Sequence, residues 1–381
     1  MDMKVKDICS LQNGRAFKPD DWGTAGLPII RIQNLNDEEA PFNYYAGDYS
    51  PVHEVNDGEL LFSWSGTPGT SFGAFRWYRG KGVLNQHIFR VIPKINVDKE
   101  YLKYALNGNI ATIISKAHGG VGLQHITKKE LDEIEIPIVP EQKQKGIVAV
   151  LQKAEKIITL RKKELQKLDD LIKARFVEMF GDPMINPKGY PIKPISELFD
   201  VGSSKRVFES EWREAGIPFY RAREIVKLAK DGFVKNELFI EEDLYEKYKA
   251  KYGIPKPGDI MVTGVGTLGV CYIVQPHDKF YFKDGNTLWF KNKGLCSERF
   301  IVEQYSTDFV RGQIEANANV STVGTYTITN ANNTRVLVPS IEEQLKFNAF
   351  VAQVDKSKAV VQKALDEAQV LSDSLMQQYF G

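Results

Sequence analysis

The two halves of this sequence repeat each other, and that repeat limits what the chain can fold into. Five residues near the start recur at an offset of 190, namely Trp22 with Trp212, Ala25 with Ala215, Gly26 with Gly216, Pro28 with Pro218 and Arg31 with Arg221. A second block, 57–69, matches 257–269 at an offset of 200, and a third, 119–137, matches 321–339 at 202. Three ordered blocks predict two tandem copies of one structural unit, each of about 190 residues.

Each copy ends in a stretch that predicts one long helix. Residues 140–183 have no interior proline and no glycine between Gly146 and Gly181, and they are rich in Leu, Lys, Glu, Ala and Ile. Gly181 followed by Pro183 is a strong helix stop. Residues 340–380 have the same character. At about 1.5 Å per residue, each helix would be about 60 Å long.

Apolar residues recur every three or four positions along both helices, which is the heptad pattern of a coiled-coil seam. The expected seam residues are Ile147, Leu151, Ile158, Leu165, Leu168, Ile172 and Met179 in the first helix and Val351, Val354, Val361, Leu365, Leu375 and Tyr379 in the second. Residues 141–180 carry ten Lys/Arg and six Asp/Glu, whereas residues 341–380 carry four Lys and six Asp/Glu. Complementary seams and opposite net charge predict that the helices pair with each other, in antiparallel orientation.

Short segments rich in aromatic and β-branched residues, such as 27–32 and 59–64, predict strands between the helices. The expected fold class is therefore α+β, with two strand-rich α+β domains separated by two long helices in a pseudo-two-fold tandem repeat. The expected boundaries are residues 1–140 and 183–339 for the domains, and 141–182 and 340–381 for the helices that pair as an antiparallel coiled coil.

Composition excludes several classes of protein. The net charge is +1, so only local charge can indicate a nucleic-acid surface. Cys9, Cys271 and Cys296 form no C-x-x-C pair, which favours reduced thiols in a cytosolic protein. The N-terminus lacks the apolar core of a signal peptide, and no apolar run reaches the ~20 residues of a membrane span. These features predict a cytoplasmic protein.

No constellation of catalytic residues recurs in both copies. His87, His118 and His125 are close in sequence, but the second copy has Thr287 in place of His87. A shared metal or general-base site would need the same ligands twice, so we expect no catalytic and no metal site. The G-T-x-G turns at 66–69 and 266–269 lack the Lys-Ser/Thr of a P-loop. They are either hairpin turns or loops that pack against a DNA phosphate.

Basic, amide and hydroxyl side chains in the loops are the candidate DNA-binding residues, because Arg suits guanine edges, Asn and Gln suit adenine, and Lys suits phosphates. In the first copy they are Arg15, Arg31, Asn34, Ser65, Thr67, Arg76, Arg79, Gln86, His87, Lys116, Gln124 and His125. In the second copy they are Lys205, Arg206, Arg221, Arg223, Thr267, Asn286, Arg311, Asn319 and Thr322. For each, a solvated surface side chain is the alternative, and a structural ion pair would also explain the repetition of Arg31 as Arg221.

With these features in order, the sequence resembles the specificity subunit of type I restriction–modification enzymes over its whole length. The resemblance lies in the A-G-L/I-P-x-x-R openings, the G-T-x-G hairpins, the loop at 120–127, the P-x-x-E-Q helix starts and the Met-Phe-Gly-Asp-Pro at 179–183. The second copy departs from the first where Tyr326 and Thr327 stand in place of Gln124 and His125.

The resemblance implies the function and the partners. Each strand-rich domain would be a target recognition domain that reads one half of a bipartite, asymmetric site in double-stranded DNA. The helices would set the spacing and dock two modification (methyltransferase) subunits, with restriction (nuclease/translocase) subunits in the full complex. S-adenosylmethionine, ATP and magnesium are expected on those partners, and this chain would be non-catalytic.

Two other functions stay open on the sequence. One is a non-catalytic coiled-coil scaffold whose strand-rich domains bind proteins. The other is a self-contained methyltransferase, which the lack of a Gly-rich S-adenosylmethionine motif disfavours.

Overall fold

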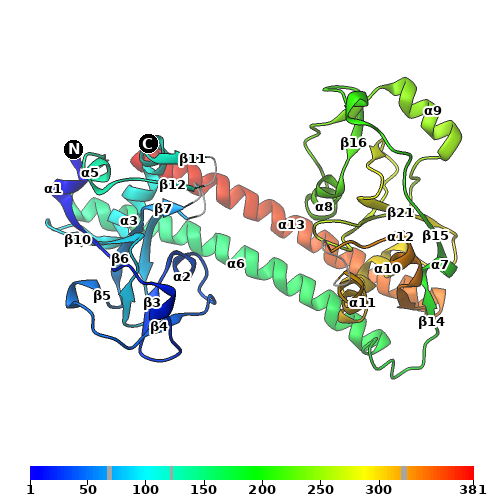
Figure 1. The fold of residues 1–381 in the computed structure, drawn as a ribbon, viewed down its shortest axis with the longest axis horizontal. Helices are drawn as coiled ribbons and strands as arrows, with labels where there is room; N and C mark the ends of the chain where they lie inside the picture. Colours follow the sequence, from blue (N-terminus) through cyan, green and yellow to red (C-terminus); the bar gives the residue numbers. More distant parts are fainter. Residues whose placement is uncertain (67–70, 121–122, 319–323) are drawn as a thin grey trace. The chain divides into compact units, whose positions relative to one another are not determined.

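A computed structural model describes residues 1–66, 71–120, 123–318 and 324–381, and these residues form two compact units (Figure 1). Unit 1 comprises Met1–Lys163 and Val361–Gly381, and unit 2 comprises Glu164–Val360. Each unit holds a strand-rich globular part together with portions of the two longest helices, α6 (Glu141–Phe180) and α13 (Ile341–Phe380). The α+β class that the sequence predicts is therefore confirmed.

The main sheet of unit 1 has four antiparallel strands in the order β2 (Cys9–Asn13), β10 (Ile88–Pro93), β6 (Glu59–Ser63) and β8 (Gly73–Trp77). Its central strand β6 is apolar without alternation because both of its faces are covered. Leu60 and Phe62 lie in the core beneath α3 (Lys99–Gly108), and Leu61 lies in a second cluster on the opposite face. A run of consecutive apolar residues is typical of a strand that is buried on both sides.

The remaining elements of unit 1 complete three smaller sheets and their helices. One sheet has the order β4 (Asn43–Tyr45), β3 (Leu27–Ile30), β9 (Gly82–Leu84), β5 (Glu54–Val55), and β3 and β9 are parallel. A second has the order β11 (His118–Gly120), β12 (Leu123–His125), β7 (Ser65–Gly66), and β1 (Asp2–Lys4) pairs with β13 (Glu135–Pro137). The short helices are α1 (Val5–Ile8), η1 (Pro19–Asp21), α2 (Ile32–Asn36), η2 (Pro51–His53), α4 (Ile110–Ser115) and α5 (Lys128–Asp132).

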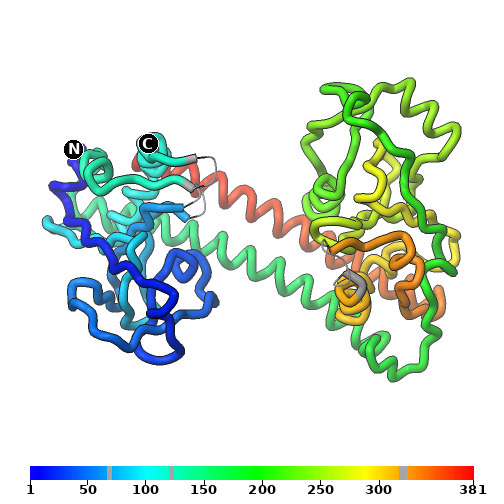
Figure 2. Tube along the Cα trace, in the orientation of Figure 1, coloured from blue at the N-terminus to red at the C-terminus, as the bar shows by residue number. Residues whose placement is uncertain are grey.

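Unit 2, whose chain path Figure 2 traces, repeats the main sheet, the sheet with a parallel pair and the two-stranded sheet of unit 1. Its described residues show no counterpart of β5 or of the sheet β11-β12-β7. Its main sheet has the order β15 (Phe199–Gly202), β21 (Thr287–Asn292), β18 (Ile260–Thr263), β19 (Cys271–Ile273). A second sheet has the order β17 (Phe239–Ile240), β16 (Ile217–Tyr220), β20 (Tyr281–Phe282), again with a parallel pair, β16 and β20, and β14 (Ile192–Pro194) pairs with β22 (Arg335–Leu337). The helices are α7 (Ile195–Leu198), η3 (Glu209–Glu211), α8 (Ala222–Asp231), α9 (Glu242–Tyr252), α10 (Glu298–Gln304), α11 (Asp308–Ala318) and α12 (Ile328–Asn333).

The backbone hydrogen bonds correct two of the sequence alignments. Trp64 N donates to His87 O in unit 1, and Gly264 N donates to Asn286 O in unit 2, so the counterpart of His87 is Asn286 and not Thr287. Thr127 caps α5 and Thr327 caps α12, which makes the offset of the third block 200 and not 202. An offset of 202 aligns Ile126-Thr127 with Ile328-Thr329 by identity of residues, whereas the register of the fold follows the capping hydroxyl. Gln124 and His125 therefore correspond to Gly324 and Thr325.

The long helices pair in antiparallel fashion, as predicted. In unit 1 the start of α6 and the end of α13 share one core, which includes Leu151 and Leu375. In unit 2 the end of α6 and the start of α13 share another, in which Phe176 packs against Phe347. All thirteen expected seam residues are buried or half-buried. The polar seam position Lys358 forms an ion pair with Asp169 at 2.6 Å.

Two phenylalanines outside the expected seam close the cores. Phe180 at the end of α6 is fully buried against Phe300 in unit 2, with ring centroids 4.9 Å apart. Phe380, 200 residues later at the end of α13, packs against Tyr101 of unit 1 at 5.4 Å. Both rings thus fill equivalent places. None of the helices in the described residues is long and apolar enough to cross a membrane.

Candidate nucleic-acid interface

The end of the main sheet of unit 1 gathers four of the candidate residues. Because the strands are antiparallel, the segment after β2 meets the segments before β10 and after β6. Arg15 N donates to Leu84 O at 2.8 Å, and Trp64 N donates to His87 O at 3.2 Å. These contacts bring Arg15, Ser65, Gln86 and His87 to one sheet end, which we call the strand-end surface of unit 1. Ser65 itself is buried there, with 8% of its surface exposed.

The small third sheet adds two more candidates to this surface. In the pairing of β12 with β7, Gln124 lies opposite Gly66 and His125 lies opposite Ser65. Sequence reasoning missed Trp64, whose indole lies 5.2 Å from the His87 ring and donates to Asn13 Oδ1 at 3.2 Å. Its position directly before Ser65 was the available signal. An aromatic ring beside imidazole and amide groups is suited to contact with base edges.

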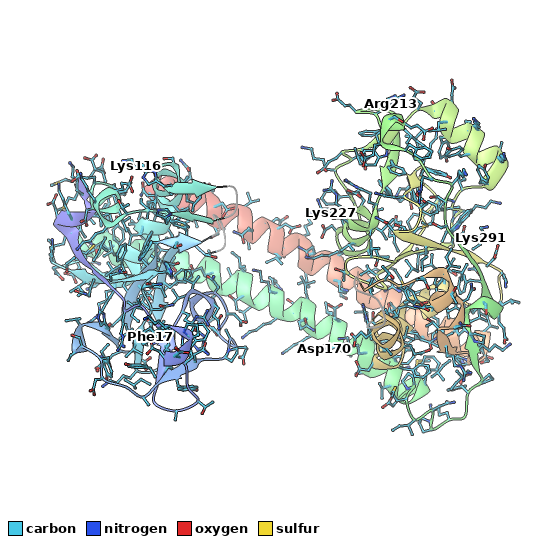
Figure 3. All side chains as sticks on the ribbon, viewed as in Figure 1. Phe17, Lys116, Asp170, Arg213, Lys227 and Lys291 are labelled. Carbon is cyan, nitrogen blue, oxygen red and sulfur yellow. The ribbon has the colours of Figure 1, made fainter. Side chains whose placement is uncertain are left out.

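Burial and hydrogen bonding set the charge of this surface. Burial lowers the pKa of His87, so its imidazole is neutral at pH 7 and carries one donor and one acceptor. Hydrogen bonds from Thr127, and then from His118, lower the pKa of Glu130 to about 2. Lys116, which follows α4, is exposed (Figure 3). Of the six candidates at this sheet end, Arg15 carries a positive charge, and the others are imidazole, amide or hydroxyl groups.

The other described candidates of unit 1 use their side chains to hold the unit together. Asn34 is only 2% exposed and donates to Ala40 O and Pro41 O. Arg79 donates to the carbonyl oxygens of Asn34, Asp37 and Ala40. Arg31 donates to Asn43 Oδ1 at 3.0 Å, and Arg76 forms an ion pair with Glu100 at 3.3 Å. Intramolecular contacts thus account for these four residues.

Unit 2 presents the equivalent sheet end, after β15 and before β21. Lys205 and Arg206 follow β15, and Asp284 and Asn286 precede β21. Arg206 Nε donates to Asp284 Oδ2 at 2.9 Å. We call these four residues the strand-end surface of unit 2. A groove of about 500 Å³ opens beside them, with lining residues that include Ser203, Ser204, Asp284, Gly285, Thr325 and Thr327.

A carboxylate holds two further candidates of unit 2. Glu224 is 5% exposed and accepts hydrogen bonds from Arg221 Nη2 at 2.8 Å and from Arg223 Nε at 2.5 Å. Burial by itself would raise the pKa of Glu224, but the hydrogen bonds from these two arginines outweigh it and hold the pKa below its ordinary value. The repetition of Arg31 as Arg221 is therefore matched by structural contacts at both positions.

The last candidates lie elsewhere. Arg311 donates to Leu268 O at 2.9 Å and lines a second groove of about 1020 Å³ beside α6, α10 and α11. Thr267 is exposed in the turn before β19, and its carbonyl accepts a hydrogen bond from Thr263. Thr67, Asn319 and Thr322 fall outside the described residues.

Replacement of Glu224 with glutamine is expected to lower the free energy of unfolding of unit 2 by about 2 kcal/mol at pH 7, because a neutral amide cannot satisfy both arginines. The folded-state pKa of Glu224 is depressed, so its stabilisation is present above about pH 4.3 and is lost as the pH falls through the folded-state value. Urea unfolding of both proteins at pH 7 and pH 4 should show the difference shrinking at the lower pH. Glu237→Gln, at a more exposed partner of Arg223, is the control and should cost less than about 1 kcal/mol.

Metal-binding groups do not stand out in the part of the chain that the structure describes. No cluster of three or more His, Cys, Asp or Glu side chains there could hold a metal ion. Burial raises the pKa of Cys9 and of Cys296 to about 12, so both thiols are protonated at neutral pH. A protonated, buried thiol is neither a nucleophile nor a metal ligand.

Comparison with known proteins relates this chain to one family. Residues 1–170 match the family described as type I restriction modification DNA specificity domain. A putative type I restriction enzyme specificity subunit of Haemophilus influenzae is 25% identical over 342 residues, which cover 87% of this chain and 80% of that protein.

Solved structures show the same fold. The type I restriction–modification S subunit from M. genitalium superposes with a TM-score of 0.56 at 16% identity, over 100% of this chain and 96% of that chain. A chain from a structure on complex assembly and conformational transition of the type I R-M system gives 0.55 at 14% identity, over 100% and 97%. Residues 1–170 thus match the type I restriction modification DNA specificity domain, in a chain that is similar along its length to the specificity subunits of these enzymes.

Proposed function

We propose that this chain is the DNA sequence-specificity subunit of a type I restriction–modification complex. Residues 1–140 and 183–339 act as two target recognition domains, and each reads one half of a bipartite site in double-stranded DNA. The observation that carries the proposal is the match of residues 1–170 to a DNA specificity domain, together with the repetition of that fold in unit 2.

The difference between the two strand-end surfaces supports an asymmetric site. Trp64 and His87 of unit 1 have Gly264 and Asn286 as their counterparts in unit 2. Unit 2 has a carboxylate, Asp284, on its strand-end surface, whereas the candidates on that of unit 1 are guanidinium, imidazole, amide and hydroxyl groups. Base edges are distinguished by their pattern of donors and acceptors, so two such different surfaces would select different base sequences.

The long helices support the docking of partner subunits and a fixed spacing. Large apolar side chains face solvent in addition to those buried in the seams. In unit 1, Val150 and Leu160 are 41% and 54% exposed, and in unit 2, Leu171 and Val177 are 46% and 52% exposed. Exposed apolar side chains on a helix that already has its partner suit contact with another protein. Two modification subunits, one on each unit, would cover these side chains.

The chemistry belongs to other chains in this proposal. The modification subunits hold S-adenosylmethionine, and the restriction subunits of the full complex hold ATP and magnesium, while this chain binds none of them and is not itself an enzyme. The complex works in the cytoplasm. What supports this division is the difference between the two units, because a catalytic centre built by this fold would be expected in both.

The test is a map of DNA methylation in cells that express this chain with its modification subunit. We expect one methylated motif made of two short half-sites and a spacer of fixed length. Replacing residues 1–140 with the corresponding domain of a relative should change one half-site and leave the other intact. Methylation without a motif, or a change in both half-sites, would contradict the proposal and favour a scaffold that binds proteins.

A further inference from the structure

Arg206 differs from the other candidate arginines because the two terminal nitrogens of its guanidinium group are available to a ligand. Its Nε donates to Asp284 Oδ2 at 2.9 Å, and its side chain is 66% exposed. Among the described residues, no hydrogen-bond or ion-pair partner is recorded for its two terminal nitrogens. The carboxylate therefore holds the guanidinium group through Nε, and the two terminal amines stay available to another partner.

The remaining arginines of the two units have no such geometry. The terminal nitrogens of Arg79 bind three carbonyl groups, and those of Arg221 bind a buried carboxylate. Arg15 donates from Nη1 to Asp48 O and stacks on Tyr45, with 4.6 Å between the guanidinium carbon and the ring centroid. These side chains stabilise the fold, so exposure and orientation together single out Arg206.

The surroundings of Arg206 suit a close approach by a large polar ligand. Gly285, the residue after Asp284, has a φ of +70°, and a Cβ built on it would meet nothing within 4 Å. Asp284 also lines the groove of about 500 Å³ at this sheet end, and Lys205 is exposed beside Arg206. No neighbouring atom of the described residues therefore crowds the backbone at Gly285, next to the Arg206–Asp284 pair.

We propose that Arg206, held in place by Asp284, reads a guanine in the half-site recognised by unit 2. Two parallel N–H donors match the O6 and N7 acceptors that guanine presents in the major groove. A phosphate contact fits less well, because the neighbouring carboxylate repels a phosphate and offsets the charge of the guanidinium group. Arg206 is thus a specificity-determining residue and Asp284 its positioning residue.

This inference rests on the proposed function, and the experiment separates the two. The chain is purified with its modification subunit, and methyl transfer is measured on DNA duplexes that carry the wild-type motif or a substitution at each position of it. Replacing residues 1–140 identifies the half-site that belongs to unit 2. In that half-site, Arg206→Ala and Arg206→Lys should each lower the preference for guanine at one G·C position by about ten- to a hundred-fold.

The Arg206→Lys variant distinguishes recognition of a base from a purely electrostatic role. Arg206→Lys keeps the positive charge but loses the two-pronged geometry, so binding to DNA without the motif and its salt dependence should stay within about two-fold of wild type. Asp284→Asn should weaken the preference at the same position. Arg213→Ala (labelled in Figure 3) is the matched control, since Arg213 pairs with Glu241 at 2.8 Å and donates to two carbonyls, and it should leave every position unchanged.

The outcomes are distinct. If the wild-type complex shows no motif, the proposed function fails and this inference fails with it. If the wild type is selective, the inference alone is overturned by any of three results: Arg206→Lys retains full discrimination, the affected position is an A·T pair, or the change falls in the half-site that the domain replacement alters.

Discussion

Replacing Phe180 with alanine is expected to lower the free energy of unfolding of unit 2 by about 3–5 kcal/mol. The Phe180 ring is fully buried and lies 5.1 Å from Phe176, 4.9 Å from Phe300 and 5.6 Å from Phe347. It therefore links the end of α6 to α10 and to the start of α13, and its removal leaves a cavity in which these three rings and that of Tyr190 lose contacts.

Hydrogen exchange is the suitable measurement, because a chain with two units need not unfold in a single step. Amides of β18 and β21 should exchange faster in Phe180→Ala, while those of β6 and β10 should not. Val177→Ala, at a position 52% exposed on the same helix, should change the stability by less than about 0.5 kcal/mol.

The equivalent substitution tests the other unit. Phe380→Ala should speed exchange in unit 1 and leave unit 2 unchanged, since Phe380 packs on Tyr101 and against Gly108, where a Cβ would lie 2.5 Å from its side chain. A loss below about 1 kcal/mol in either unit would mean that the ring does not belong to that core.

Gly216→Ala is expected to destabilise unit 2 by at least about 3 kcal/mol, because backbone strain and a steric clash add. Gly216 has a φ of +128°, which side chains of L-residues rarely adopt, and a Cβ there would lie 2.4 Å from Ile240 O. Relief of that clash would separate β16 from β17, whose pairing joins Ile217 to Ile240. Gly26 repeats the situation in unit 1, with a φ of +105° and a Cβ position 2.2 Å from Tyr45 O.

Thermal unfolding of Gly216→Ala, followed by circular dichroism, checks this prediction against Gly312→Ala. Gly312 lies inside α11, with nothing within 4 Å of its Cβ position, so alanine there should be neutral or stabilising by up to about 1 kcal/mol. Equal melting temperatures for the two variants would refute the steric argument. The glycine in the repeated A-G-L/I-P motif is thus explained by strand geometry and needs no role in binding.

The architecture could be predicted from the sequence because the patterns that indicate it extend over many residues. A period of three to four residues sustained over about forty positions predicts α6 and α13, and the matched blocks predict a second copy of the strand arrangement. The same signals do not locate Phe180 or Phe380, because a ring directly after the last residue of a heptad seam is recognised only when its neighbours from other helices are known.

The candidate interface was harder to predict for a physical reason. An arginine whose guanidinium group is free and an arginine whose guanidinium group binds carbonyls look the same in the sequence. Arg79 and Arg206 both lie in loops, yet Arg79 binds three backbone carbonyls of its own unit, while Arg206 presents two amines to solvent. The offset of His87 failed similarly, since the second copy is one residue shorter before the counterpart of His87 and regains that residue before the third block, and no letter marks where.

The division of the chain into units also bears on the order of events during protein synthesis. Unit 2 is continuous in sequence, but the core of unit 1 needs Phe380, which follows the whole of unit 2 in the sequence. A ribosome that adds about 5–20 residues per second makes the globular part of unit 1 first and supplies its closing helix only after unit 2. The domain translated first therefore waits, with part of its core uncovered, for the domain translated second.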